Sequence, residues 1–400
     1  METAEAVVIG GGVAGTSTAF WLARKGLKRV VLLERTGLAL GATGRSAAFI
    51  RLHYTNPWDA LLALRSLQMF QDWKEMVGGE CGFRRTGFLC LAGRHEKGKL
   101  LANIRLLRGV GVNTTFLPPE DLRLLQPFME VEDLAGAAYE PESGYADGSD
   151  TAHSLARRFR EMGGQVQVGV PALRLLVHGG RVKGVQTTQW EIEAPTVVLA
   201  AGAWSAPLAQ TAGVALPITP KRLTVGILQR PTSGIDHLTV IDHSLGFYFR
   251  PEGAPEARLS LVGFEGSREG WTTGEAVDPD NFKQDADYPQ MVEGARKMSR
   301  RIPALAEAYW KRTWSGVDGY TPDGHILLGA VPEVQGLYIA TGGSGTNFKT
   351  GPAVGLCMAE LILEGEAKTV DIAPFRPSRF AEGKPIVGEY EYTPLPEEGG

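Results

Sequence analysis

Three glycines near the start of the chain have the spacing of a turn that binds a dinucleotide. Gly10, Gly12 and Gly15 follow the apolar run Ala6 to Ile9, and a helical pattern begins directly behind them. In such a turn the first glycine permits the bend, the second lets a pyrophosphate approach the backbone, and the third lets helix and strand pack closely. The phosphates then lie at the positive N-terminus of the helix. The spacing predicts a bound NAD or FAD, which the motif alone does not distinguish.

A carboxylate at the end of the next strand supports the same interpretation. The first helix is predicted to close at Gly26, and Val30 to Glu34 follows as an apolar strand. Glu34 stands where an acidic residue would accept hydrogen bonds from an adenosine ribose. A surface glutamate is the alternative, but a carboxylate at the end of an apolar strand at this spacing favours the ribose.

Two later segments of small residues could lie along the same cofactor. Residues 41–48 combine hydroxyls with one arginine, which suits a loop beside a cofactor, although an ordinary surface loop is the alternative. Far along the chain, a strand at 336–341 leads into the tight loop 342–347, and a helix is predicted over 352–363. Because this repeats the opening design, the second loop is expected to return to the same dinucleotide.

Length and charge narrow the class of protein. Four hundred residues exceed what one hydrophobic core usually serves, so two domains are expected. The net charge of −4 gives no general attraction to nucleic acid or anionic membranes. The acidic start of the chain lacks the features of a secretory signal. Cys81, Cys90 and Cys357 form no C-x-x-C pair, which indicates neither a disulfide framework nor a metal site, so a cytoplasmic location is expected.

One uncharged stretch, Ala194 to Pro220, is long enough to cross a membrane. Four prolines interrupt it, together with several glycines and polar residues. We therefore predict a buried strand at 196–200, followed by a loop and a short helix, and no membrane span.

The order of the predicted elements indicates an α/β fold with two kinds of sheet. A helix capped by Asp150 or Thr151 leads into a strand at 165–170, which would join the strands of the glycine turn in a parallel sheet. From Lys221 to Leu261 strands follow one another without helices, which predicts a second, α+β domain on a mostly antiparallel sheet. The first domain would be Rossmann-like. Further predictions are a strand at 87–91, helices at 57–77, 96–109 and 291–301, shorter helices from Pro119 and Pro303, and a solvated loop or helix start at 278–287.

Taken in order, these motifs resemble the FAD-dependent D-amino acid oxidase (DAO) superfamily, and more closely its sarcosine oxidase and glycine oxidase branch. The likeness runs nearly end to end and implies that the dinucleotide is FAD. Besides the glycine turn and Glu34, it depends on five segments: Gly41–Arg51, Val197–Trp204, Phe247–Pro251, Thr321–Gly324 and Gly342–Lys349.

The resemblance implies a discontinuous FAD-binding domain, with the flavin extended and its ring at the interface with a substrate domain. The ranges would be 1–52, 136–220 and 318–381 for the FAD-binding domain, 53–135 and 221–317 for the substrate domain, and 382–400 for a C-terminal tail. The residues implied to hold FAD are Gly10, Gly12, Val13, Ala14, Gly15, Glu34, Arg35, Thr43, Gly44, Arg45, Ser46, Val170, Ala201, Gly202, Trp204, Gly343, Gly345, Thr346, Asn347, Phe348 and Lys349.

In this branch an arginine and the lysine of a G-F-K triplet clamp the substrate carboxylate, and Arg51 and Lys349 match them. An arginine offers a two-pronged donor to a carboxylate, and a lysine adds a second positive charge. Lys349 alone could be a solvated surface cation, whereas the apolar neighbours of Arg51 favour a buried partner. Tyr248 matches a tyrosine of the substrate cavity, with core packing as the alternative. His53 could shape the pocket, although a lone histidine is more often structural.

Three positions depart from the branch. The cysteine that binds flavin covalently in sarcosine oxidases is Gly316 here, so FAD should be non-covalent. The oxygen-activating lysine corresponds to Leu261, which leaves developing superoxide less stabilised and puts fast reaction with O2 in doubt. The family's G-H-G-F-K motif reads G-T-N-F-K at Gly345–Lys349. The identity of the substrate therefore does not carry over from the family.

The resemblance implies FAD-dependent oxidation of the C–N bond of a small amino acid: sarcosine, glycine or another N-alkyl or D-amino acid. Hydride transfer to flavin N5 would give an imine that water hydrolyses, with O2 or an electron-accepting carrier reoxidising the flavin. The alternatives are a dehydrogenase that passes electrons to a carrier and an FAD-binding assembly factor or scaffold without turnover. An NAD-dependent dehydrogenase would leave the later glycine loops unexplained.

Overall fold

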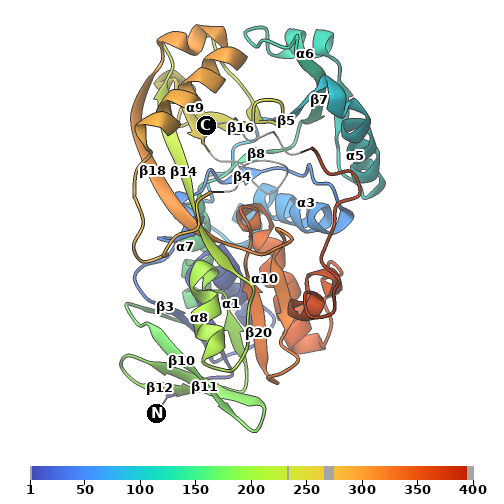
Figure 1. The fold of residues 1–400 in the computed structure, drawn as a ribbon. Coiled ribbons are helices and arrows are strands. Elements are labelled where there is room, and N and C mark those ends of the chain that lie inside the picture. Colours follow the sequence, from blue (N-terminus) through green and yellow to red (C-terminus); the bar gives the residue numbers. More distant parts are fainter. Residues whose placement is uncertain (1, 232–233, 265–273, 394–400) are drawn as a thin grey trace.

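The computed structural model describes residues 2–231, 234–264 and 274–393 (Figure 1). Its first main sheet has the strand order β19-β20-β13-β2-β3-β9, and all neighbours are parallel except β19 and β20. The predicted parallel sheet is therefore confirmed. The bounds of its strands are β2 Ala6–Ile9, β3 Val30–Glu34, β9 Gln165–Val168, β13 Val197–Leu199, β19 Leu327–Ala330 and β20 Leu337–Thr341.

Both faces of the central part of this sheet are covered, which explains why strands β2 and β13 are apolar and buried along their whole length. Val8 and Leu32 face a core with helices α1 (Val13–Arg24), α7 (Gly148–Glu161) and α10 (Asn347–Glu364). Val7 and Leu33, one residue along each strand, face α8 (Ser205–Gln210) and a small sheet instead. Successive side chains alternate between the faces of a strand, so one β-branched run supplies both cores. The small sheet consists of β1 (Glu2–Thr3), β10 (Ala172–His178), β11 (Arg181–Thr187) and β12 (Glu191–Glu193).

The second main sheet forms the upper part of Figure 1 and is antiparallel except between β15 and β5. Its order is β18-β14-β17-β16-β15-β5-β7-β6, which confirms the mostly antiparallel sheet predicted for the second domain. The strands are β5 Phe88–Gly93, β6 Thr115–Leu117, β7 Leu134–Glu140, β14 Thr219–Gln229, β15 Thr239–Asp242, β16 Phe247–Glu252, β17 Leu259–Gly263 and β18 Tyr309–Tyr320. Other elements are β4 Phe49–Ile50, β8 Gly144–Tyr145, α2 Ala42–Arg45, α3 Pro57–Gln71, α4 Trp73–Met76, α5 Lys97–Gly109, α6 Pro119–Leu125 and α9 Tyr288–Arg301.

Helix α10 begins at Asn347, so the predicted start at Pro352 is wrong. Pro352 lies inside the helix, where a proline removes one backbone hydrogen bond. The buried hydroxyl of Ser66 on α3 satisfies the backbone on both sides of the proline, because it donates to the carbonyl of Thr350 at 3.0 Å and accepts from the amide of Ala353 at 3.0 Å. The first turn of α10 therefore lies directly beside the glycine loop.

Three smaller differences concern a helix cap, the length of a helix and one strand. Asp147 caps α7 by accepting from the amide of Asp150, so the predicted cap at Asp150 or Thr151 is wrong. The helix predicted over 57–77 is divided at Asp72 into α3 and α4. Strand β18 was not predicted, although it pairs with β14 along its length.

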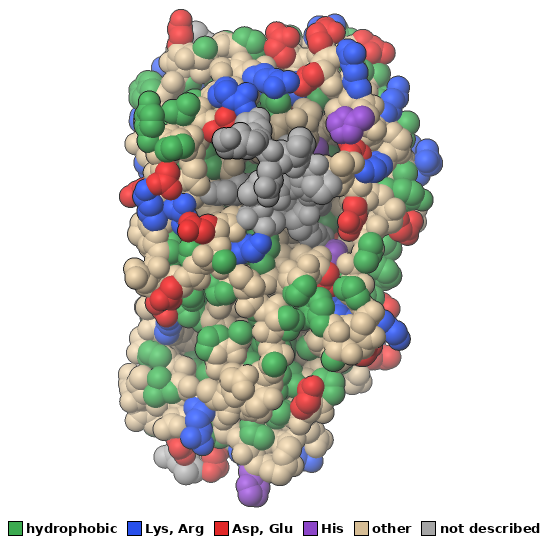
Figure 2. Space-filling model, in the orientation of Figure 1, with side chains coloured by type: hydrophobic (Ala, Val, Ile, Leu, Met, Phe, Trp, Pro, Cys, Tyr) green, Lys and Arg blue, Asp and Glu red, His purple; other side chains and the backbone are tan. Residues whose placement is uncertain are grey.

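The uncharged stretch from Ala194 folds into β13, α8 and the start of β14. In the described parts of the chain, no helix is long and apolar enough to cross a membrane. On the face shown in Figure 2, acidic and basic side chains are interspersed. The domain ranges stay a prediction: β7 begins at Leu134 and pairs within the second main sheet, whereas α3 packs on α10.

Candidate active site

A cavity of about 930 Å³ is lined by residues of both main sheets. It reaches from Glu34 at the end of β3 to Arg51, Tyr248 and Lys349. Four residues predicted for the site lie outside its lining: Gly15, Gly44, His53 and Thr346. The predicted residues that line it are Gly10, Gly12, Val13, Ala14, Glu34, Arg35, Thr43, Arg45, Ser46, Arg51, Val170, Ala201, Gly202, Trp204, Tyr248, Gly343, Gly345, Asn347, Phe348 and Lys349.

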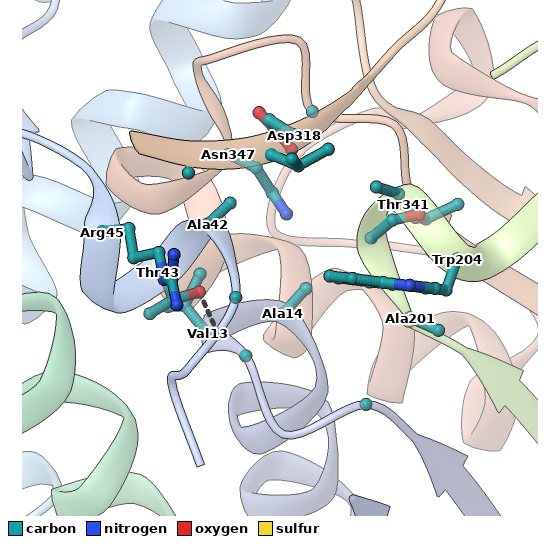
Figure 3. A pocket seen from close by; sticks show the side chains of 18 of the residues that line it. Val13, Ala14, Ala42, Thr43, Arg45, Ala201, Trp204, Asp318, Thr341 and Asn347 are labelled. Atoms are coloured by element: carbon teal, nitrogen blue, oxygen red, sulfur yellow. Dashed lines mark hydrogen bonds between the residues drawn. The ribbon is translucent and has the colours of Figure 1, made fainter. Parts of the chain in front are cut away.

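The glycine turn brings the N-terminus of α1 to the cavity wall. Gly10 has φ +116°, and a Cβ there would lie 2.3 Å from the carbonyl oxygen of Ala200 on the neighbouring strand. A Cβ on Gly15 would lie 1.8 Å from the carbonyl oxygen of Gly10, so this glycine lets helix and strand approach. Thr43 reaches across and accepts from the amide of Val13 at 3.0 Å (Figure 3).

Glu34 is fixed at one end of the cavity by backbone donors. Its Oε2 accepts from the amide of Gly11 at 2.7 Å, and its Oε1 accepts from the amide of Thr36 at 2.9 Å. The amide of Val170 donates to the carbonyl of Glu34 at 3.0 Å, which holds Val170 beside it. This arrangement fixes the carboxylate beside the glycine turn.

The segment 278–287, which directly precedes α9, contributes Asp278, Pro279, Asp280 and Phe282 to the cavity wall and is not only a solvated loop. Asp280 accepts from Arg35 at 2.6 Å and from the indole nitrogen of Trp204 at 2.9 Å. The Arg35 guanidinium also lies 4.2 Å from the centre of the Trp204 ring. Arg45 donates to Gln284 of the same segment at 2.6 Å. The segment thus ties the second sheet to three residues implied to hold the dinucleotide.

Arg51 follows β4 and is 2% exposed. Its guanidinium donates to the carbonyl of His53 and lies 4.6 Å from the Tyr54 ring. The next amide, of Leu52, donates to Oε2 of the buried Glu140 at 2.8 Å. The backbone and the side chain of Arg51 are therefore held from two sides, while the residue still contributes to the cavity wall.

Lys349 and Tyr248 line the same cavity as Arg51. Lys349 lies in the first turn of α10 and is buried, with its Nζ 3.5 Å from the carbonyl of Thr346. The surface-cation alternative for Lys349 is therefore wrong. Tyr248 stands edge-to-face on Phe49, with ring centres 5.4 Å apart. Opposite it in the sheet is Gly263, where a Cβ would lie 1.9 Å from the Tyr248 ring, so only glycine leaves room for the tyrosine in this position.

His53 does not line the cavity. It is buried, and its Nε2 lies 2.8 Å from the hydroxyl of Tyr392. It therefore stands in the layer behind the wall that Arg51 forms. Tyr392 belongs to the stretch that the sequence placed in a C-terminal tail.

Asp318 and Asn347 are polar residues on the cavity wall, and only Asn347 was predicted for the site from the sequence. Asp318, on the unpredicted strand β18, accepts from the amides of Gly345 at 2.7 Å and Gly319 at 2.8 Å. Burial raises the pKa of its carboxyl, against the lowering effect of the two amides and Lys349. Asn347 also lines the cavity (Figure 3), and its Oδ1 is buried with no hydrogen-bond partner in the described parts of the chain.

The cavity fits an extended dinucleotide. Helix α1 presents its N-terminal amides behind a glycine turn, and Glu34 stands one strand away. The loop before α10 brings a second set of small residues to the same cavity. The buried Oδ1 of Asn347 needs a donor that the described residues do not supply, as a ligand in the cavity would. These residues are therefore suited to hold FAD.

Glu140 gives the region a pH dependence that can be measured. Burial raises the pKa of its carboxyl to about 7 from the ordinary 4.5, although Ser143 and the Leu52 amide donate to it. The folded state thus favours the protonated form, and the resulting stabilisation is complete below about pH 4.5 and lost as the pH rises through about 7. The loss should reach up to about 3 kcal/mol.

We expect Glu140→Gln to remove this pH dependence of stability, because a glutamine side chain does not titrate. The free energy of unfolding in urea, measured between about pH 4.5 and 8, should fall more steeply for the wild type than for the variant. Glu142→Gln, two residues away and partly exposed, is the control and should follow the wild type. Parallel curves for the wild type and Glu140→Gln would contradict the assignment.

Comparison with known proteins identifies the family. The profile of the DAO family, described as FAD dependent oxidoreductase, matches residues 5–361. The chain belongs to this family of FAD-dependent oxidoreductases, as its motifs predicted.

Several similar proteins are named for the sarcosine and glycine oxidase-like branch. The chain is 30% identical to mouse FAD-dependent oxidoreductase domain-containing protein 1 (96% of this chain, 86% of that protein). It is 31% identical to human mitochondrial sarcosine dehydrogenase, over 91% of this chain but only 40% of that protein, and 30% identical to the sarcosine oxidase β subunit of Arthrobacter (95% and 91%). Among solved structures, it resembles L-proline dehydrogenase from P. horikoshii (TM-score 0.87, 28% identity, 96% and 100% covered) and glycine oxidase from Geobacillus kaustophilus (TM-score 0.80, 25% identity, 95% and 99%).

Proposed function

We propose that this protein oxidises the C–N bond of a small α-amino acid, such as sarcosine, glycine or another N-alkyl or D-amino acid, with non-covalent FAD. The observation that carries the proposal is the shared cavity, which joins the glycine turn to Arg51 and Lys349. Relatives named for sarcosine and glycine oxidation support this substrate class. Gly316 on the cavity wall offers no thiol to a flavin, which supports non-covalent binding.

The charges on the wall suit an amino acid. Arg51 and Lys349 would bind the carboxylate of the substrate, the first through a two-pronged hydrogen bond and the second as a point charge. Asp318, on the same cavity wall, can accept an N–H of the amine or its proton. FAD, when bound, accepts the hydride lost from the carbon beside the amine. The protein contributes orientation: it would hold the carboxylate so that the carbon beside the amine faces the flavin. The imine that forms is then hydrolysed by water.

We further propose that electrons leave through a carrier faster than through O2. Leu261, where the branch has its oxygen-activating lysine, is buried in an apolar cluster with Phe49 and Ile241. A hydrocarbon in this place stabilises no developing superoxide charge. The reduced protein should therefore react slowly with oxygen.

A two-step experiment tests the proposal. A panel of amino acids is mixed anaerobically with the flavin-loaded protein, and bleaching of the flavin is recorded. The reduced protein is then exposed to oxygen or to an artificial electron-accepting dye. We expect at least one small amino acid to bleach the flavin and the dye to reoxidise it faster than O2 does. Failure of every amino acid to bleach the flavin would refute the proposed function. Fast peroxide formation would refute the proposal that electrons leave mainly through a carrier.

A further inference from the structure

The end of the described chain crosses from the first main sheet to the second (Figure 1, dark red). We call residues 386–393 the C-terminal strap. It is tied to both halves of the molecule by hydrogen bonds that involve its backbone. These are Ile386 N to Asp323 Oδ2 (2.9 Å), Glu389 N to the Thr55 carbonyl (2.8 Å), Asn103 Nδ2 to the Tyr390 carbonyl (3.0 Å) and Thr393 N to Glu96 Oε1 (2.9 Å).

Of the two tyrosines in the strap, Tyr392 is the more deeply buried. It is 3% exposed, whereas Tyr390, two residues earlier, is 40% exposed. The Tyr392 ring stacks on His243 with centres 4.2 Å apart, and its hydroxyl lies 2.8 Å from Nε2 of His53. A tyrosine held by both its ring and its hydroxyl fixes the position of its partner.

His53, the hydrogen-bond partner of Tyr392, also contacts Arg51 of the proposed carboxylate clamp. The carbonyl of His53 accepts from the guanidinium of Arg51, which lies two residues earlier on the same turn of chain. Tyr392 also packs in the apolar cluster of Phe49 and Ile241, and both of these residues line the cavity. The strap therefore contacts the back of the wall that the proposed substrate would meet.

We propose that the C-terminal strap supports the substrate site: Tyr392 positions Arg51 through His53. The inference rests on the proposed function, because it assigns Arg51 to a substrate carboxylate. Tyr392 is a positioning residue: it touches neither the cavity nor the reacting atoms. Loss of its hydroxyl leaves Nε2 of the buried His53 without this partner, and the turn that carries Arg51 loses one support.

The test measures carboxylate binding directly, by calorimetric titration of the flavin-loaded protein with sodium acetate. Tyr392→Phe keeps the ring and removes only the hydroxyl, and Tyr390→Phe is its matched control. We expect the first to raise the Kd for acetate about tenfold and the second to leave it unchanged. In a His53→Leu background, Tyr392→Phe should have little further effect, because the two residues act through one contact. Thermal unfolding shows whether each variant is folded.

A second variant keeps the test decisive if Tyr392→Phe does not fold. Asn103→Ala removes the bond to the Tyr390 carbonyl and should weaken acetate binding a few-fold by loosening the strap. Equal Kd values for acetate in the wild type and the folded variants would overturn the inference. In that case, bleaching of the wild-type flavin by an amino acid would still uphold the proposed function. Absence of bleaching with normal acetate binding would instead refute the function alone.

Discussion

Arg51→Met should lose most of the affinity for an amino acid substrate while the protein keeps its flavin. Arg51 is buried and lines the cavity, so a substrate carboxylate bound to it would be shielded from water. Removing one partner of a buried, hydrogen-bonded charge pair weakens binding by ~2–5 kcal/mol. The KM, or the Kd from anaerobic flavin reduction, should therefore rise roughly 30- to 4,000-fold. Methionine fills a similar length without charge.

The control for this variant is Arg84→Met, which removes an exposed arginine. It should change neither KM nor flavin content. Because an assembly factor without turnover would not depend on Arg51 for substrate, the same pair of variants separates that alternative from an enzyme. Wild-type KM in a folded, flavin-loaded Arg51→Met protein would show that the carboxylate is bound elsewhere.

Gly15→Ala should yield protein without bound flavin. The added Cβ would lie 1.8 Å from the carbonyl oxygen of Gly10, and both are backbone positions that no side-chain rotation can relieve. Helix α1 would have to move away from β2, and the amides at its N-terminus would leave the cavity wall. The loss is read from the visible absorption of the purified protein and from flavin released on denaturation.

Gly98→Ala is the matched control for that substitution. Gly98 lies in α5, and a Cβ there would have no atom of the described residues within 4 Å. Alanine in this helix should keep the full flavin content and raise the unfolding free energy by up to about 1 kcal/mol. Full flavin occupancy in Gly15→Ala would contradict the cofactor position.

The parallel sheet and the glycine turn could be predicted because their signals are local. The run from Ala6 to Gly15 contains its own strand, turn and helix start, and the same holds for the strand that ends at Glu34. The loop at Gly342–Asn347 could be associated with the opening turn because it repeats its design. The pattern that identifies each of these elements lies within one short stretch of sequence.

The features that were not predicted depend on contacts between distant segments. Pro352 is accommodated inside α10 because Ser66, from another helix, satisfies the backbone beside it. Strand β18 has a mixed polar and aromatic sequence, and its pairing with β14 carries Asp318 to the cavity. Aromatic residues at its start and the threonine that follows were a usable strand signal. No local pattern distinguishes Tyr392, which is buried, from Tyr390, which is not.

The most direct test of the account compares paired ligands that differ only in the carboxylate. Sarcosine and glycine are each mixed anaerobically with the flavin-loaded protein, beside dimethylamine and methylamine, which carry the same amines without the acid. We predict that at least one of the amino acids bleaches the flavin, that its carboxylate-free partner does not, and that Arg51→Met abolishes the difference at equal concentration. Equal bleaching by an amino acid and its carboxylate-free partner would contradict the carboxylate clamp, and with it the central claim.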